Sequence, residues 1–200
     1  MYSEPFGKDF KTIQMRVINL HQDEDNLIQW AKEGNRSAQQ SIYQKFAPKM
    51  LSVCRQYIKD VHLAEDVMIT AFMKVFVNLK NFEHKGSFEG WIRRIMVNES
   101  ISFLRVQKKV TFLEDTFINE RDFEVESSHL SVDDLQLLID QLPDGYKTVF
   151  NLYVIEGYKH HEIAKMLHIN EGTSKSQLSQ ARKMLQNQIN VLNQKNHEAQ

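Results

Sequence analysis

Apolar residues in this chain recur every three or four positions, which is the spacing of one face of an α-helix. Residues 64–79 are the clearest case, because they carry two apolar sides rather than one. The first side contains Ala64, Met68, Ala71, Val75 and Leu79, and the second contains Ile69, Phe72, Met73 and Phe76. A helix that is apolar on more than one side is either deeply buried or docks a partner.

The same spacing predicts helices on both sides of this one, and together they make a first helical unit over residues 26–109. The first helix ends at Gly34, and Pro48 predicts a bend or a new start in the second. Gly86 interrupts the pattern, and Ser87 is a suitable N-cap for the last helix of the unit. Four helices around one apolar core form a compact unit.

A second helical unit spans residues 131–191. Pro143 stops its first helix, and Gly157 ends its second. Two short helices follow, and Asn170 is placed to cap the second of them. Two helices joined by so tight a turn fit a helix-turn-helix. The sequence therefore predicts an all-α fold of two small helical domains, the second of which contains a helix-turn-helix.

Charge is distributed unevenly along the chain, although the total is only −1 at pH 7. Residues 49–110 hold eleven basic and six acidic residues, and residues 146–200 hold seven and four. Between them, residues 111–145 hold one basic and ten acidic residues. This pattern predicts a flexible acidic linker over residues 110–130, an N-terminal arm over 1–25 and a C-terminal tail over 192–200. The linker is either a solvated tether or an acidic strand that lies in a channel for nucleic acid.

Composition and motifs argue against several classes of protein. The single Cys54 rules out an internal disulfide, and no run of 18 apolar residues could cross a membrane, so we expect a cytoplasmic protein without membrane insertion. His161 and Glu162 resemble the start of a zinc-protease helix, but Lys165 stands where the second histidine is required. The sequence shows no nucleophile–base pair and no glycine-rich phosphate loop. It therefore predicts no catalytic residue, no metal site, no cofactor and no enzymatic activity.

The second helix of the helix-turn-helix carries polar and basic side chains on faces that we expect to point away from its own core. Glutamine matches the edge of adenine, while lysine and arginine read guanine or hold phosphate. The capped N-terminus also offers free N–H groups to the DNA backbone. The predicted DNA-binding residues of this helix are Asn170, Thr173, Lys175, Ser176, Gln177, Ser179, Gln180, Arg182 and Lys183. The alternative is a solvated amphipathic helix in a small bundle.

Three segments, in this order, resemble parts of the extracytoplasmic-function (ECF) group of bacterial sigma-70 RNA polymerase sigma factors. AEDVMITAFMKVF, residues 64–76, resembles the region 2 helix that grips the clamp of core polymerase. GSFEGWIRRIMVNESISFLR, residues 86–105, resembles the segment that melts and reads the −10 element. Residues 142–185 resemble region 4, which reads the −35 element. The resemblance implies that the first unit is region 2 and the second unit is region 4.

This resemblance implies roles for individual residues in the first unit. The contacts with core polymerase would come from Glu65, Asp66, Ile69, Thr70, Phe72 and Met73. Binding and melting of the −10 element would come from Asn81, Phe82, His84, Lys85, Ser87, Phe88, Arg93, Arg94, Arg105, Lys108 and Lys109. In the family the loop over residues 81–87 captures a flipped base. The sequence leaves open whether Phe82 and Phe88 stack on a base or belong to the core, whereas Trp91 is expected in the core.

Several positions depart from the family pattern. Ile69 and Thr70 replace more polar residues in the polymerase-binding helix, which makes that contact less polar. Lys159, Ser174 and Gln177 are unusual in the helix-turn-helix, so the −35 sequence cannot be derived from the chain.

The resemblance implies a sigma factor that binds core RNA polymerase, recognises −35 and −10 promoter DNA and assists melting. It would be a monomer when free or in holoenzyme. Its near-neutral charge fits this role, because core polymerase supplies most of the positive surface. Many members also bind an anti-sigma factor, and the sequence leaves open whether this chain has one. The alternatives are a stand-alone dimeric helix-turn-helix regulator, and a protein–protein adaptor that docks a partner through residues 60–80.

Overall fold

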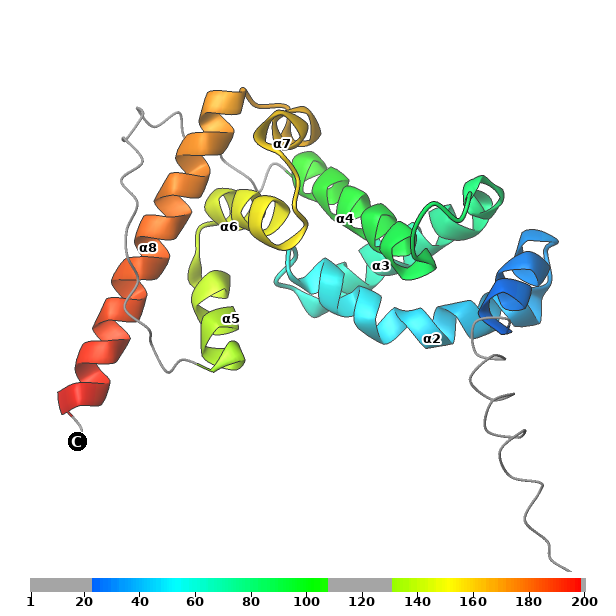
Figure 1. The fold of residues 1–200 in the computed structure, drawn as a ribbon, viewed down its shortest axis with the longest axis horizontal. Helices are drawn as coiled ribbons and strands as arrows, with labels where there is room; N and C mark the ends of the chain where they lie inside the picture. Colours follow the sequence, from blue (N-terminus) through cyan, green and yellow to red (C-terminus); the bar gives the residue numbers. More distant parts are fainter. Residues whose placement is uncertain (1–22, 108–130, 199–200) are drawn as a thin grey trace, which may run out of the picture.

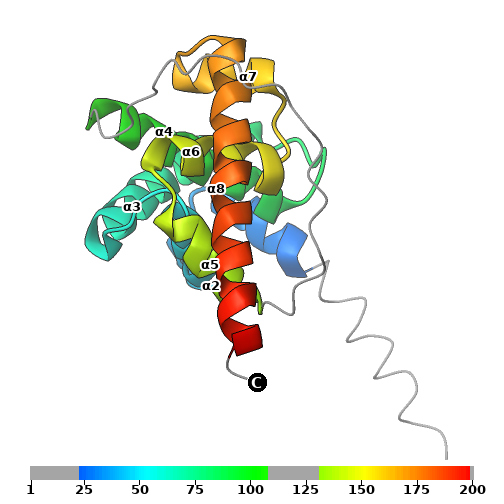
Figure 2. The ribbon, with the colours of Figure 1, turned by 90° about the vertical axis from the view of Figure 1, so that its left-hand side faces the viewer.

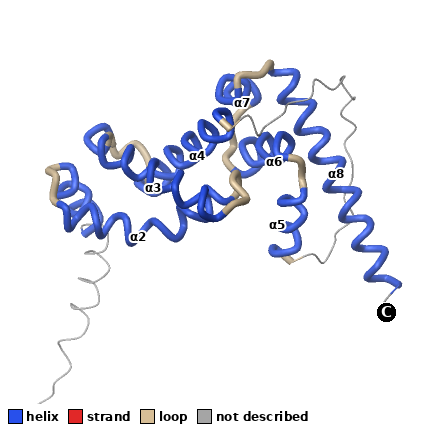
Figure 3. The backbone as a smooth tube through the Cα atoms, turned by 180° about the vertical axis from the view of Figure 1, so that it is seen from behind, coloured by secondary structure: helices blue, strands red, loops and turns tan. Residues whose placement is uncertain are grey.

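The computed structural model describes residues 23–107 and 131–198, and it contains helices and no strand within those ranges (Figure 3). A helix over residues 23–32 comes first. The elements that follow are α2 (Arg36–Arg55), α3 (Val61–Val77), η1 (Leu79–Asn81), α4 (Phe88–Val106), α5 (Val132–Gln141), α6 (Asp144–Phe150), η2 (Asn151–Ile155), α7 (His160–Leu167) and α8 (Glu171–Glu198) (Figure 1). The prediction of an all-α fold is confirmed. The expected linker and most of the expected N-terminal arm lie outside the described residues.

The first unit is a bundle in which α2, α3 and α4 pack against one another. Its centre contains Ile42, Met50, Ile92 and Met96, all fully buried. The helices begin where side chains can cap them: the Ser87 hydroxyl, for example, accepts a hydrogen bond from the Gly90 N–H at 3.1 Å. The predicted cap at Ser87 is therefore confirmed.

A single helix, α2, runs through Pro48, so the new start that the sequence suggested there is wrong. The buried side chains of Phe46 and Met50 hold the segments before and after the proline in the same core. Pro48 has no backbone N–H, so the helix lacks one hydrogen bond at this position. The Ser52 hydroxyl donates to the Pro48 carbonyl at 3.2 Å. Burial on both sides therefore outweighs the local cost of the proline.

In the second unit, the short helices α6 and α7 pack against the long helix α8. Leu142, Leu152 and Ile163 are fully buried there. α8 continues well beyond the helix-turn-helix to Glu198, because no glycine or proline follows Gly172 to stop it. It runs as one rod beside α5 and α6 (Figure 2). The expected C-terminal tail is thus largely an extension of this helix.

Lys147, in α6, has a side chain that is only 1% exposed, and its Nζ lies 3.7 Å from Oδ1 of Asp140. Burial lowers the pKa of this ammonium group below its ordinary value of 10.5, because the charged form is disfavoured away from water. Asp140 is 44% exposed and stays solvated without its partner. The buried charge therefore destabilises the fold at neutral pH.

We expect the free energy of unfolding of Lys147→Met at pH 7 to be about 1–2 kcal/mol higher than that of the wild type. A lowered folded-state pKa means that the unfolded chain binds more protons, so the wild type gains stability as the pH rises through that pKa towards 10.5. The difference between the two proteins should therefore shrink between pH 7 and 10, measured by urea unfolding. Lys80→Met removes an exposed lysine of the first unit and should show a constant difference. A constant difference for Lys147→Met as well would contradict the prediction.

Candidate protein and nucleic-acid interfaces

An apolar row lies on the outside of α3. Ile69, Met73 and Val77 are 48%, 65% and 80% exposed, and they are spaced by four residues on one face. We call this row the α3 face. Glu65, Asp66 and Thr70 are also accessible, and the Thr70 hydroxyl donates to the Asp66 carbonyl at 2.9 Å. An exposed apolar patch with a polar rim is typical of a protein-binding surface.

Phe72 does not belong to the α3 face, so its predicted contact with a partner is wrong. Its side chain is 2% exposed, and its ring packs edge-on against Tyr43 with 4.9 Å between the centroids. It lies on the side of α3 that faces α2. Val77, by contrast, is part of the face and was missed, because it lies at the end of the apolar pattern.

A pocket of about 360 Å³ lies at the loop between η1 and α4. Its lining residues are Asn81, Phe82, Glu83, Lys85, Gly86, Ser87, Gly90, Trp91 and Arg94. The loop turns sharply at two residues with left-handed backbone, His84 at φ 56° and Gly86 at φ 131°. Only glycine adopts the second conformation without strain, so Gly86 fixes the rim of the pocket. Lys32, which the sequence did not point to, donates from Nζ to the Phe82 carbonyl at 3.0 Å and ties the loop to the first helix.

The structure decides where the aromatic residues around this pocket lie, which the sequence left open for Phe82 and Phe88. Phe82 and Phe88 are 5% and 3% exposed and pack together, with 5.1 Å between their ring centroids. Phe88 contributes to the core and does not line the pocket, whereas Phe82 lines the pocket although it is largely buried. Trp91, which was expected in the core, is half-buried and lines the pocket. Trp91 therefore replaces the phenylalanines as the ring available for stacking.

The basic residues predicted on α4 fall into separate environments. Arg94 is exposed and reaches the pocket. Arg93 donates from Nε and Nη2 to the two carboxylate oxygens of Glu156, at 2.8 and 2.6 Å. Arg105 donates from Nη1 to the Met166 carbonyl at 3.3 Å. The structure thus pairs two of these arginines with the second unit. Lys108 and Lys109 lie outside the described residues.

The second helix of the helix-turn-helix, α8, begins as predicted. The Asn170 side chain accepts a hydrogen bond from the Thr173 N–H at 2.6 Å and so caps α8. His168, in the turn, has φ 56° and ends α7 in the left-handed conformation. Lys175, Arg182 and Lys183 are exposed, and Ser179 and Gln180 are partly exposed. Lys175 pairs with Glu171 at 2.9 Å and lowers the pKa of that carboxyl.

Thr173, Ser176 and Gln177 are 7%, 8% and 1% exposed, so the prediction that they point away from the core is wrong. α8 packs against both α6 and α7, and its buried arc is wider than the single apolar stripe that the sequence shows. Ser174, in the same arc, contacts Nδ1 of His160 through its hydroxyl at 2.9 Å. The accessible members of the predicted DNA-binding set on α8 are therefore Lys175, Ser179, Gln180, Arg182 and Lys183.

Within residues 23–107 and 131–198, no group of three or more histidine, cysteine or acidic side chains is arranged to hold a metal ion. No described helix is both long and apolar enough to cross a membrane.

Two families match most of the helical part of the chain: "Sigma-70 region 2" over residues 42–110 and "Sigma-70, region 4" over residues 133–185. The chain is 27% identical over 179 residues to the ECF RNA polymerase sigma factor SigW of Bacillus subtilis, covering 82% of this chain and 96% of that protein. It is 30% identical over 133 residues to the RNA polymerase sigma factor SigV of the same organism, covering 66% and 80%. A solved structure of the sigma factor RpoE in complex with the anti-sigma factor NepR from Bartonella quintana aligns with a TM-score of 0.47 and 22% identity, over 76% of this chain and 98% of that one.

Proposed function

Because the chain belongs to the ECF group of the sigma-70 family of RNA polymerase sigma factors, we propose that its two helical units read two separate promoter elements while the α3 face docks on core polymerase. The observation that carries this assignment is the arrangement of the first unit. An exposed apolar row and a pocket with aromatic and basic lining are held on the packed helices α3 and α4. A protein that must grip an enzyme and strand-separated DNA together needs both surfaces on one rigid body.

The pocket beside α4 is the proposed site of a flipped −10 base. Trp91 offers an aromatic face for stacking, and Arg94 and Lys85 stand where phosphates would pass. Asn81, Glu83 and Ser87 supply donors and acceptors for the edge of a base. His84 lies at the rim, with its ring 4.6 Å from that of Phe82. These groups match what a base needs once it has left the stack.

We assign the −35 element to the exposed side of α8. Lys183 and Lys175 provide charge for the backbone, and Gln180 has the donor and acceptor pair that recognises adenine. Arg182 lies over the ring of Tyr153, with 5.9 Å to the centroid, which orients its guanidinium group. We further propose that the protein acts as a monomer in the cytoplasm, without catalysis of its own, and that an anti-sigma factor is a candidate partner.

The test is run-off transcription of sheared genomic DNA by purified core polymerase with and without the protein, followed by sequencing of the RNA ends. We expect new, sharply defined start sites that share two upstream elements. Unchanged RNA ends, with the folded protein binding duplex DNA alone, would instead support a stand-alone helix-turn-helix regulator. Unchanged ends without any DNA binding would support an adaptor.

A further inference from the structure

The loop between η1 and α4, which shapes the proposed −10 pocket, is held from outside by the first helix, over residues 23–32. Lys32, at the end of that helix, donates from Nζ to the Phe82 carbonyl at 3.0 Å. The same ammonium group lies 5.7 Å from the centroid of the Phe82 ring. One lysine therefore makes both a charge-assisted hydrogen bond and a cation–π contact with a single residue of the loop.

The loop backbone has few other polar contacts that fix it. Within the described part of the chain, residues 83–86 make no backbone–backbone hydrogen bond. Asp25, also on the first helix, lies 3.7 Å from Nδ1 of His84, but the two side chains are 68% and 51% exposed. An exposed ion pair of this kind contributes little. The hydrogen bond from the half-buried Lys32 is therefore the strongest polar contact that fixes this end of the loop.

The Phe82 carbonyl lies next to the groups that we propose read a base. Asn81 and Glu83 are the chain neighbours of Phe82, and both line the pocket together with Trp91. The ring of Phe82 lies 5.5 Å from that of Trp91, so the polar wall and the stacking face of the pocket meet at this residue. A hydrogen bond requires a donor–acceptor distance of about 2.7–3.2 Å and weakens steeply when it is misaligned. The position of this loop therefore decides which base edges the pocket can bond.

Stacking and edge recognition depend on the loop to different extents. Every base has a π-face, so stacking on Trp91 tolerates any base. The identity of a flipped base is read by hydrogen bonds to its edge, which Asn81 and Glu83 would supply. Trp91 is carried by α4, whereas Asn81 ends η1 and Glu83 lies in the loop. A looser loop should thus reduce the choice between bases more than it reduces total binding.

We infer that Lys32 is a positioning residue for base selection at the −10 pocket, and that the first helix braces the loop through it. Lys32 does not line the pocket, so it acts through the Phe82 carbonyl and not on the base itself. The first helix precedes residues 42–110, which match region 2, so the brace lies outside the matched part of the unit. The inference rests on the proposed function of the pocket.

The test compares Lys32→Met with the wild type in holoenzyme, by the binding of single-stranded −10 oligonucleotides taken from the mapped start sites. Each base of the element is replaced in turn by the other three, and the readout is the ratio of affinities between the best and the worst base at each position. At the most selective position we expect Lys32→Met to lower this ratio about tenfold and to change the affinity for the worst base by less than about twofold, because edge hydrogen bonds are lost and stacking is kept. Lys32→Arg keeps a charged donor and should retain most of the ratio.

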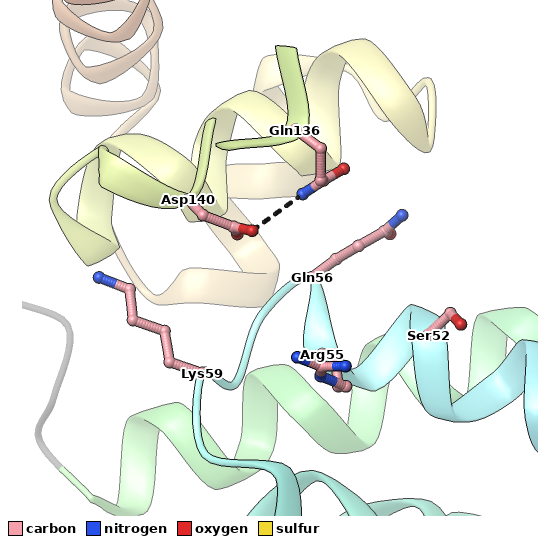
Figure 4. A pocket seen from close by; sticks show the side chains of 6 residues that line it. All are labelled: Ser52, Arg55, Gln56, Lys59, Gln136 and Asp140. Atoms are coloured by element: carbon pink, nitrogen blue, oxygen red, sulfur yellow. Dashed lines mark hydrogen bonds between the residues drawn. The ribbon is translucent and has the colours of Figure 1, made fainter. Parts of the chain in front are cut away.

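Lys59→Met is the matched control for the loss of one positive charge. Lys59 is 58% exposed and lines a separate cleft of about 460 Å³, between the end of α2 and α5 (Figure 4). Its replacement should leave the ratio and the affinities at their wild-type values. Thermal unfolding checks that each variant is folded, and Lys32→Gln, whose shorter side chain also loses the bond, takes the place of Lys32→Met if that variant is unfolded.

Two outcomes would overturn the inference. One is an unchanged ratio in the folded Lys32 variant. The other is an equal loss of affinity for all four bases, which would show that Lys32 holds the strand by its charge. Failure of the proposed function is distinguishable from both, because the wild-type holoenzyme would then show no base preference at any position of the −10 strand.

Discussion

Replacement of Met73 by glutamate is expected to abolish promoter-directed transcription and leave the protein folded. Met73 is 65% exposed in the free chain, so a carboxylate there stays in water and costs little stability. When the α3 face docks on core polymerase, the same carboxylate is taken out of water without a partner. Such a charge costs about 2–5 kcal/mol, which corresponds to a loss of about 30-fold to several thousandfold in affinity for core polymerase.

The measurement for Met73→Glu is competition for core polymerase against a labelled wild-type chain, together with thermal unfolding. Val191→Glu is the matched control, since Val191 is 50% exposed on α8 and outside the α3 face. Phe72→Ala should instead lower the stability of the fold. The cavity that it leaves beside Tyr43 should reduce the free energy of unfolding by about 3–5 kcal/mol. Wild-type affinity of a folded Met73→Glu for core polymerase would show that the α3 face is not the docking surface.

The positions of the helices could be predicted because the apolar spacing and the capping residues within each segment indicate the same helices. The apolar spacing of α3, the cap at Ser87 and the cap at Asn170 each depend on residues within a few positions of one another. Local signals also predicted the α3 face as far as Met73, because the apolar residues up to that position recur at helical spacing. These features needed no knowledge of how distant segments pack.

The errors share a different physical origin. Thr173, Ser176 and Gln177 are polar, and a polar side chain in a helix is expected to be exposed unless a second element covers it. Here α8 packs against α6 as well as α7, and nothing near residue 173 in the sequence announces the contact with α6. The pairing of Arg93 with Glu156 joins positions 63 residues apart and could not be read from either segment. The sequence left the role of Phe88 open and placed Trp91 in the core, because only packing decides which of two rings three positions apart on α4 is the more deeply buried.

Replacement of Trp91 by alanine is expected to weaken the binding of single-stranded −10 DNA by the holoenzyme about 5- to 150-fold. The physical reason is the loss of one base–aromatic stacking contact, which contributes about 1–3 kcal/mol. Trp91→Phe keeps a ring that lines the pocket and should recover most of the affinity. The holoenzyme is the right preparation, because the proposed function places the melted −10 strand in the complex with core polymerase. The affinity is measured by fluorescence anisotropy with an oligonucleotide taken from the mapped start sites.

Phe88→Leu separates stacking from core packing at the same pocket. Phe88 is 3% exposed and packs between Phe46 and Trp91, so its loss should lower the free energy of unfolding by about 1–2 kcal/mol. Binding of the −10 strand should stay near the wild-type value, because Phe88 does not line the pocket. If Phe88→Leu instead loses DNA affinity while Trp91→Ala keeps it, the base must reach the inner ring. The loop that Gly86 shapes would then have to open before a base can enter, and the pocket of the free chain would be a closed form of the site.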